Sequence, residues 1–137
     1  LKILIFGLPG SGKSTLAEPF AKEIRGVWIN ADKVREKYND WDFTIQGRIR
    51  QAQRMRFLAD EVVKSGSIAV ADFVCPTKQA RIEFAPDYTV WMNTIEEGRY
   101  EDTNKLFQVP DRVDFHITEW NEHNHKDIAK KILNWSQ

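Results

Sequence analysis

The sequence lacks three features that would each point to a particular class of protein. It carries no net charge, because twenty lysine and arginine residues balance twenty aspartate and glutamate residues, so no overall field gathers nucleic acid or an anionic membrane. Its single cysteine, Cys75, excludes an intramolecular disulfide and fits a reducing compartment. No apolar run approaches the length of a membrane-spanning helix. We therefore expect a cytoplasmic protein that has no membrane partner, and the neutral charge argues weakly against a nucleic-acid partner.

The chain is also short and has no internal repeat or low-complexity segment. Its 137 residues suffice for one hydrophobic core and are too few for a motor ATPase with an added lid domain. Leu1 leads directly into the first predicted strand, so we expect no signal peptide. We predict a single domain over residues 1–137 and leave a homodimer open.

Short strand patterns alternate with helical patterns along the chain. Strands rich in β-branched or aromatic residues are predicted at Lys2–Phe6, Val27–Ile29, Ile68–Ala71 and Tyr88–Met92. Helices are predicted at Lys13–Arg25, Asp32–Lys37, Thr44–Lys64, Thr77–Phe84 and Ile117–Trp135. Pro19 removes a backbone hydrogen bond inside the first helix, so we expect a kink or break there. Short strands with helical crossovers indicate a three-layer α/β/α sandwich with a mostly parallel central sheet, whose ligands gather at the carboxyl ends of the strands.

The segment Gly7–Thr15 reads Gly-Leu-Pro-Gly-Ser-Gly-Lys-Ser-Thr and lies between a predicted strand and a predicted helix. This spacing is that of a phosphate-binding loop (P-loop), whose backbone N–H groups surround the β-phosphate of a nucleotide. The lysine reaches the β- and γ-phosphates, the next serine ligates Mg²⁺, and the helix N-terminus adds positive charge. The dinucleotide-binding fingerprint fails, because Thr15 replaces its third glycine. A polar segment, Gly98–Lys105, either closes over the phosphates or is a plain surface loop. With Arg99 from that segment, the predicted nucleotide-binding residues are Gly7, Gly10, Ser11, Gly12, Lys13, Ser14, Thr15 and Arg99.

Two aspartates follow predicted strands at the edge where this loop lies. Asp32 comes just after the second strand, where a carboxylate can orient or deprotonate an acceptor hydroxyl and would equally serve as a helix N-cap. Asp72 closes the third strand, where phosphate-loop enzymes carry a carboxylate near the metal and where an aspartate in a turn is equally common. The predicted catalytic residues are Lys13, Asp32 and Asp72, and the predicted Mg²⁺ ligands are Ser14 and Asp72.

The third predicted helix carries four arginines, at positions 48, 50, 54 and 56. Such a cluster is usually a solvated face, and Arg56 can pair with Asp60 at helical spacing. Arg48 and Gln51 lie one turn apart, however, and could jointly bind an anionic substrate. Residues interpreted as core on composition are Trp91, Trp120, Trp135 and Cys75.

Taken together, these motifs resemble those of the adenylylsulfate kinase family. That family has a GLxGxGKST loop, an Asp-Gly-Asp-Asn-(Val/Ile)-Arg segment, a Gly-Phe segment followed by Asp-Arg and Asn, and a Phe-Ile-Ser-Pro-Tyr segment followed by Arg. The corresponding segments here are Gly7–Thr15, Asn30–Arg35, Asp42–Gln51 and Phe73–Thr77 with Arg81. The resemblance implies a P-loop kinase-like fold and two small-molecule nucleotide substrates.

By this resemblance the γ-phosphate of ATP, with Mg²⁺, passes to the 3′-hydroxyl of adenylylsulfate and gives 3′-phosphoadenylylsulfate. Phe43 would stack on the adenine of the acceptor, and arginines would meet its phosphosulfate, which suits an aromatic dianion. The implied acceptor-site residues are Arg35, Phe43, Arg48, Gln51, Val74 and Cys75.

The sequence also departs from the family pattern. Asn30 replaces the first acid of the Asp-Gly-Asp triplet, so Asp32 acts alone or shares its task with Asp72. Gly47 and Gln51 stand where the family has Asp and Asn, and the family's longer lid is reduced. Two alternatives therefore stay open. One is a small P-loop kinase with another acceptor, such as a nucleoside, a nucleotide, a modified base, a polynucleotide end or a small alcohol; the other is a catalytically weak ATP-binding module.

Overall fold

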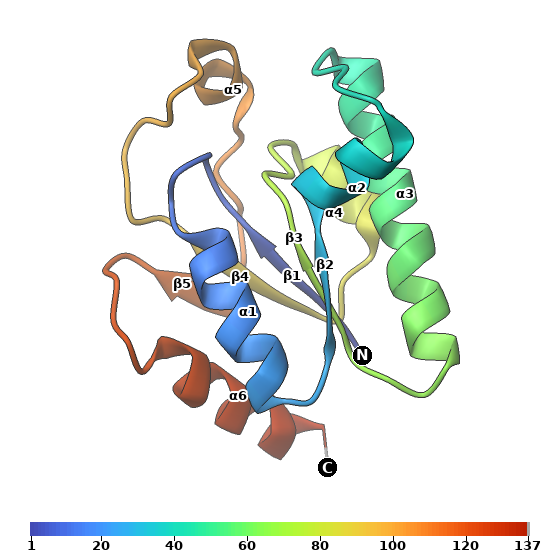
Figure 1. Ribbon diagram of the computed structural model, residues 1–137. Helices are drawn as coiled ribbons and strands as arrows, with labels where there is room; N and C mark the ends of the chain where they lie inside the picture. Colours follow the sequence, from blue (N-terminus) through green and yellow to red (C-terminus); the bar gives the residue numbers. More distant parts are fainter. Residues whose placement is uncertain (137) are drawn as a thin grey trace.

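In residues 1–136, which a computed structural model describes, the chain forms one five-stranded sheet (Figure 1). The strands are β1 (Lys2–Phe6), β2 (Val27–Asn30), β3 (Ala69–Asp72), β4 (Tyr88–Met92) and β5 (Phe115–Ile117). Their spatial order is β2-β3-β1-β4-β5, and every neighbouring pair is parallel. The parallel sheet and its first four strands confirm the prediction, whereas β5 is additional.

Helices cover both faces of this sheet, which gives the predicted three layers (Figure 1). One face carries α1 (Lys13–Glu23) and α6 (Asn124–Trp135), and the other carries α2 (Ala31–Tyr38), α3 (Ile45–Lys64) and α4 (Lys78–Phe84). A short helix, α5 (Glu101–Leu106), stands between β4 and β5 in the chain. Among residues 1–136, no helix combines the length and apolarity that crossing a membrane requires.

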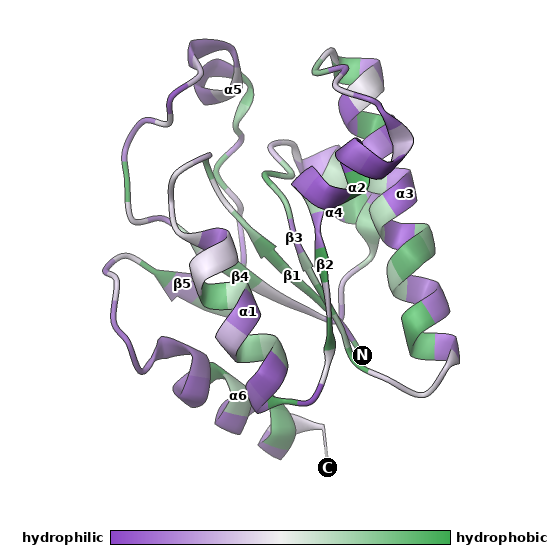
Figure 2. Cartoon of the chain, in the orientation of Figure 1, coloured by the Kyte–Doolittle hydropathy of each residue, from purple (hydrophilic) through white to green (hydrophobic). Residues whose placement is uncertain are grey.

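Each face of the sheet has its own hydrophobic cluster. Successive side chains of a strand point to opposite faces, so Ile3 and Ile5 pack beneath α1 and α6, while Leu4 and Phe6 pack beneath α3 and α4. All four side chains are fully buried. Burial on both faces explains why β1 is a continuous apolar run rather than an alternating one. Figure 2 shows hydrophobic residues along β1 and mostly hydrophilic residues over α5.

The last predicted helix is wrong in its first part. It begins at Asn124 rather than Ile117, because the segment Phe115–Ile117 pairs with β4 as an edge strand. Two partly buried side chains alternate there with the exposed His116, which is the period of a strand. The interpretation of Trp120 as core is also wrong, since that side chain is 49% exposed.

Two further differences concern Pro19 and the segment after β4. The helix α1 runs through Pro19 without a break. A proline inside a helix loses one backbone hydrogen bond and costs about 3 kcal/mol of stability. The helix α1, however, buries Leu16 and Phe20 completely against the sheet. Each of these buried side chains stabilises the fold by about 1.5–3 kcal/mol. Tertiary burial therefore outweighs the proline. The segment Gly98–Lys105, for which closure over phosphates and a plain surface loop were both left open, contains most of the helix α5. The interpretation of Trp135 as core is wrong as well, because that side chain is half exposed and stacks on Phe115 at the surface.

Candidate active site

The carboxyl ends of the strands open into a cavity of about 910 Å³, a size typical of small-molecule sites. Its walls come from the loop after β1, the start of α2, the segment entering α3, the loop after β3 and the beginning of α5. The predicted site residues on its wall are Gly10, Gly12, Lys13, Ser14, Thr15, Asp32, Arg35, Phe43, Arg48, Gln51, Asp72, Val74, Cys75 and Arg99. Residues far apart in the sequence thus meet at one place, as expected for a parallel sheet.

The glycines of the phosphate-binding loop have a structural reason for their positions. Gly10 and Gly12 have φ angles of +88° and +96°, in the left-handed region that residues with a Cβ rarely adopt. A Cβ at Gly7 would overlap the carbonyl oxygen of Met92 at the end of β4. Gly7 and Ser11 are not among the residues that line the cavity. The Ser11 hydroxyl is buried with no hydrogen-bond partner among residues 1–136.

Lys13 begins α1 and faces the cavity. Its ammonium donates to the carbonyl oxygen of Leu8 at 3.1 Å. Burial lowers the pKa of Lys13, while the nearby carboxylates of Asp72 and Asp32 act against that shift and Arg99 adds to it. A desolvated cation beside a helix N-terminus favours an anion at the same place, because the anion replaces the hydration that the ammonium has lost.

Asp72, at the end of β3, receives three side-chain donors. Trp28 Nε1 and Asn30 Nδ2 both donate to Oδ2, at 2.8 and 3.0 Å. The Ser14 hydroxyl lies 3.3 and 3.4 Å from the two carboxylate oxygens. Burial raises the pKa of Asp72, and these hydrogen bonds together with Lys13 oppose that rise. Because Ser14 is the only donor at Oδ1 among the described residues 1–136, that oxygen is the one best placed for a cation.

This arrangement fits Mg²⁺, which prefers oxygen ligands and takes one or two carboxylates together with phosphate oxygens and water. The hydroxyl of Ser14 and the carboxylate of Asp72 supply two neighbouring oxygen donors from the ends of α1 and β3. Both are the residues predicted to ligate the metal. The remaining ligands would come from the nucleotide and from solvent.

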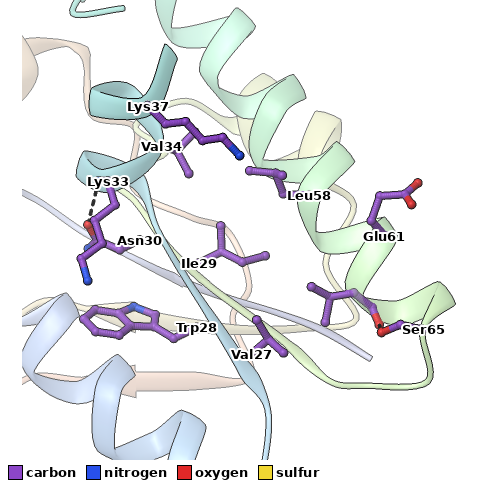
Figure 3. A pocket seen from close by; sticks show the side chains of 11 residues that line it. Val27, Trp28, Ile29, Asn30, Lys33, Val34, Lys37, Leu58, Glu61 and Ser65 are labelled. Carbon is purple, nitrogen blue, oxygen red and sulfur yellow. Dashed lines mark hydrogen bonds between the residues drawn. The ribbon is translucent and has the colours of Figure 1, made fainter. Parts of the chain in front are cut away.

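Asn30 is the N-cap of α2, a role that was one of two alternatives predicted for Asp32. Its Oδ1 accepts from the backbone N–H of Lys33 at 3.1 Å, drawn as the dashed line in Figure 3. Its Nδ2 donates to Ser14 Oγ at 3.2 Å as well as to Asp72. Asp32 lies in the first turn of α2, exposed and on the cavity wall. The capping alternative for Asp32 is therefore wrong, and its carboxylate faces the cavity.

A smaller hollow of about 490 Å³ lies along the outer edge strand β2, between α2 and α3 (Figure 3). It shares Asn30 with the main cavity. Sequence reasoning did not identify Trp28, whose indole N–H holds Asp72 and whose ring carries the Lys33 ammonium 5.4 Å from its centroid. The sequence signal is limited to a tryptophan inside the predicted strand Val27–Ile29, two residues before Asn30.

The far end of the cavity is aromatic and basic. The Phe43 side chain is 52% exposed, and the guanidinium carbons of Arg35 and Arg48 lie 4.3 and 5.5 Å from its ring centroid. Burial lowers the pKa of both guanidinium groups, and an arginine remains charged at neutral pH. Arg48 also donates to the Phe43 carbonyl at 2.8 Å and to Thr103 Oγ1 of α5 at 2.9 Å. One residue thereby joins the aromatic wall to the helix across the cavity.

Gln51 and the segment after β3 complete this end. The buried Gln51 Nε2 donates to the Ala31 carbonyl at 3.1 Å, and its Oε1 lies 3.5 Å from Arg54 Nη1, so Gln51 joins α3 to α2 at this end of the cavity. Cys75 has a φ of +45°, and burial raises the pKa of its thiol, which is therefore neutral. Its carbonyl accepts from the buried Arg81 at 3.0 Å. Cavity-lining residues that sequence reasoning did not identify include Trp41, Tyr100, Asp102 and Thr103.

Comparison with known proteins agrees with the resemblance. The family model described as "Adenylylsulphate kinase" matches residues 1–109. A probable adenylyl-sulfate kinase from Aeropyrum pernix is 33% identical over 85 residues, which are 58% of this chain and 46% of the relative. An adenylyl-sulfate kinase from Bacillus pumilus is 28% identical over 138 residues, which are 96% of this chain and 62% of the relative. The chain thus spans less than two thirds of either relative.

A similar fold is found in the structure of the Mycobacterium tuberculosis APS kinase CysC in complex with AMPPNP and APS. The TM-score is 0.75 at 16% identity, over 97% of this chain and 95% of that one. At that identity the likeness establishes a P-loop kinase fold. Because the family model covers most of the sequence, including the phosphate-binding loop and both ends of the cavity, the chain belongs to the adenylylsulfate kinase family.

Proposed function

We propose that this chain is an ATP-dependent kinase that phosphorylates the 3′-hydroxyl of adenylylsulfate. The observation that carries the proposal is the single cavity that joins the phosphate-binding lysine to an aromatic end with two arginines. Family membership supports the same reaction, as does the related M. tuberculosis protein, whose structure holds AMPPNP and APS. The acceptor is an aromatic dianion, which guanidinium groups and an aromatic ring are suited to bind.

At the donor end, the backbone N–H groups of the loop and Lys13 bind the β- and γ-phosphates of ATP. Ser14 and Asp72 hold Mg²⁺, which when bound neutralises charge on the phosphate oxygens. Arg99 lies on the cavity wall close enough to Lys13 to lower its pKa. We assign Arg99 to the phosphates, where a second cation stabilises the charge that spreads over the transferred group.

At the acceptor end, Phe43 stacks on the adenine, and Arg35 and Arg48 bind the phosphosulfate. The 3′-oxygen attacks the γ-phosphorus, the bond from that phosphorus to the bridging oxygen breaks, and ADP leaves. Asp32 accepts the hydroxyl proton, since it is an exposed carboxylate on the cavity wall and lies near Lys13. Val74 and Cys75 line the same end through the segment that Arg81 holds.

The test is the rate of ADP release by the purified chain with Mg²⁺ and ATP, measured without acceptor and with a panel of hydroxyl compounds. We expect adenylylsulfate to raise the rate far more than nucleosides, other nucleotides, oligonucleotide ends or sugars do. A larger stimulation by one of those compounds would replace adenylylsulfate as the acceptor. ATP binding without stimulation by any acceptor would favour a catalytically weak nucleotide-binding module.

Three expectations from the sequence stay predictions. They concern the single domain over residues 1–137, the homodimer and the cytoplasmic location. Sedimentation of the purified chain at several concentrations measures the second of these directly.

A further inference from the structure

The loop between α2 and α3, residues 39–44, places two exposed aromatic side chains on the cavity wall. Trp41 is 51% exposed and Phe43 is 52% exposed. Half of each side chain is open to solvent, and the contacts of the Phe43 ring with Arg35 and Arg48 cover only part of its surface. Their position therefore depends on what holds the backbone of the loop.

An ion-pair network holds the loop from outside the cavity. Asp40 accepts from Arg50 Nε at 2.7 Å through Oδ2 and from Arg50 Nη2 at 3.2 Å through Oδ1, which is a two-point pair. Arg54 Nη2 donates to the same Oδ2 at 2.6 Å, and Arg50 also reaches Asp42 Oδ2 at 3.1 Å. These hydrogen bonds keep the pKa of Asp40 well below its usual range. Two-point guanidinium–carboxylate pairs fix geometry better than single contacts do.

The loop is also held from its inner side. Arg35 Nη1 donates to the carbonyl oxygens of Asp40 and Asp42, at 3.0 and 3.2 Å. The first turn of α3 packs directly on the loop, because a Cβ at Gly47 would overlap the carbonyl oxygen of Asp42. This contact explains why the family's aspartate is absent at position 47. The loop is thus pinned between α2 and α3.

We propose that Asp40, Arg50 and Arg54 are positioning residues that fix the aromatic wall of the acceptor end. None of the three is among the described residues that line the cavity. Asp40 and Arg50 act through the loop that carries Trp41 and Phe43, and Arg54 holds Asp40 and also reaches Gln51 Oε1 at 3.5 Å. The identity of the acceptor rests on the proposed function, whereas the fixing of the loop rests on the geometry alone. The prediction is that breaking the network weakens acceptor binding and leaves ATP binding intact.

The test compares Arg50→Ala with Arg56→Ala. Both arginines lie on α3, both side chains are 44% exposed, and both pair with an aspartate, but Arg56 pairs with Asp60, away from the loop. We expect Arg50→Ala to raise the KM for adenylylsulfate by about tenfold, the size of one charge-assisted contact. The KM for ATP stays within about twofold by the same reasoning. Arg56→Ala changes neither value.

Hydrogen exchange of residues 39–44 gives a second readout that needs no acceptor. Exchange in this loop should be faster in Arg50→Ala and in the nearly isosteric Asp40→Asn, and unchanged in Arg56→Ala. Wild-type acceptor KM together with wild-type exchange in both loop variants would overturn the inference. If the wild-type protein shows no turnover with adenylylsulfate, the proposed function fails, while the exchange result still decides whether the network fixes the loop.

Discussion

Restoring the family's acid at position 30 should destabilise this protein in the absence of a metal. In Asn30→Asp, an oxygen replaces the Nδ2 that donates to Asp72 Oδ2 at 3.0 Å. A hydrogen bond to a charged group contributes about 1.5–3 kcal/mol. Two carboxylate oxygens about 3 Å apart repel each other by at most roughly 5 kcal/mol at an effective dielectric constant of 20. The repulsion is smaller if the two side chains move apart or share a proton. The cap on Lys33 survives, because aspartate caps helices as well as asparagine does.

We expect the free energy of unfolding to fall by about 2–4 kcal/mol in Asn30→Asp. The assay is urea unfolding at pH 7 with EDTA, repeated with Mg²⁺ and ATP. A divalent cation between the two carboxylates removes their repulsion, so Mg²⁺ with ATP should restore much of the loss. The control is Gln53→Glu, which adds the same charge at an exposed position in the middle of α3. An unfolding free energy within about 0.5 kcal/mol of wild type in EDTA would refute the assigned contact between Asn30 and Asp72.

Three further predictions concern activity. Lys13→Ala should lower kcat by at least about a hundredfold. Its thermal unfolding midpoint should stay at the wild-type value, because burial already disfavours the Lys13 charge in the folded protein. Undiminished turnover would contradict the assignment of the loop to phosphate binding. Arg48→Ala should raise the acceptor KM much more than the ATP KM, since it loses the contacts with Phe43 and Thr103; equal weakening of both substrates in steady-state kinetics would argue against it. Asp32→Asn should lower kcat by about 10²–10⁴ without changing ATP affinity, and a kcat within threefold of wild type would remove Asp32 from the role of base.

The donor end could be predicted from the sequence because its signal is local. A strand, a glycine-rich turn and a helix are continuous in the chain, and Gly7–Thr15 fixes their geometry by steric rules. The parallel sheet followed for the same reason, from short apolar runs separated by helical patterns. Asp32 and Asp72 could be placed at the cavity because parallel strands align their carboxyl ends.

The features that were missed depend on contacts between distant segments. The strand β5 is three residues long, too short for a periodic signal, and exists because it pairs with β4. The contact of Trp28 with Asp72 joins residues 44 positions apart. The burial of α1 that offsets Pro19 is likewise a tertiary effect. Whether Trp120 is core or exposed depends on the path of the chain after β5, which local composition does not determine.

The most direct test of the central claim follows the phosphorus atom. The purified chain is given Mg²⁺, adenylylsulfate and ATP labelled in its γ-phosphate, and the products are separated and analysed by mass spectrometry. We predict that the label appears on the 3′-oxygen of the adenylylsulfate ribose in the wild-type protein and not in Lys13→Ala. Label found only in inorganic phosphate would contradict the account, because it would show that water, rather than a hydroxyl bound in this cavity, receives the phosphoryl group.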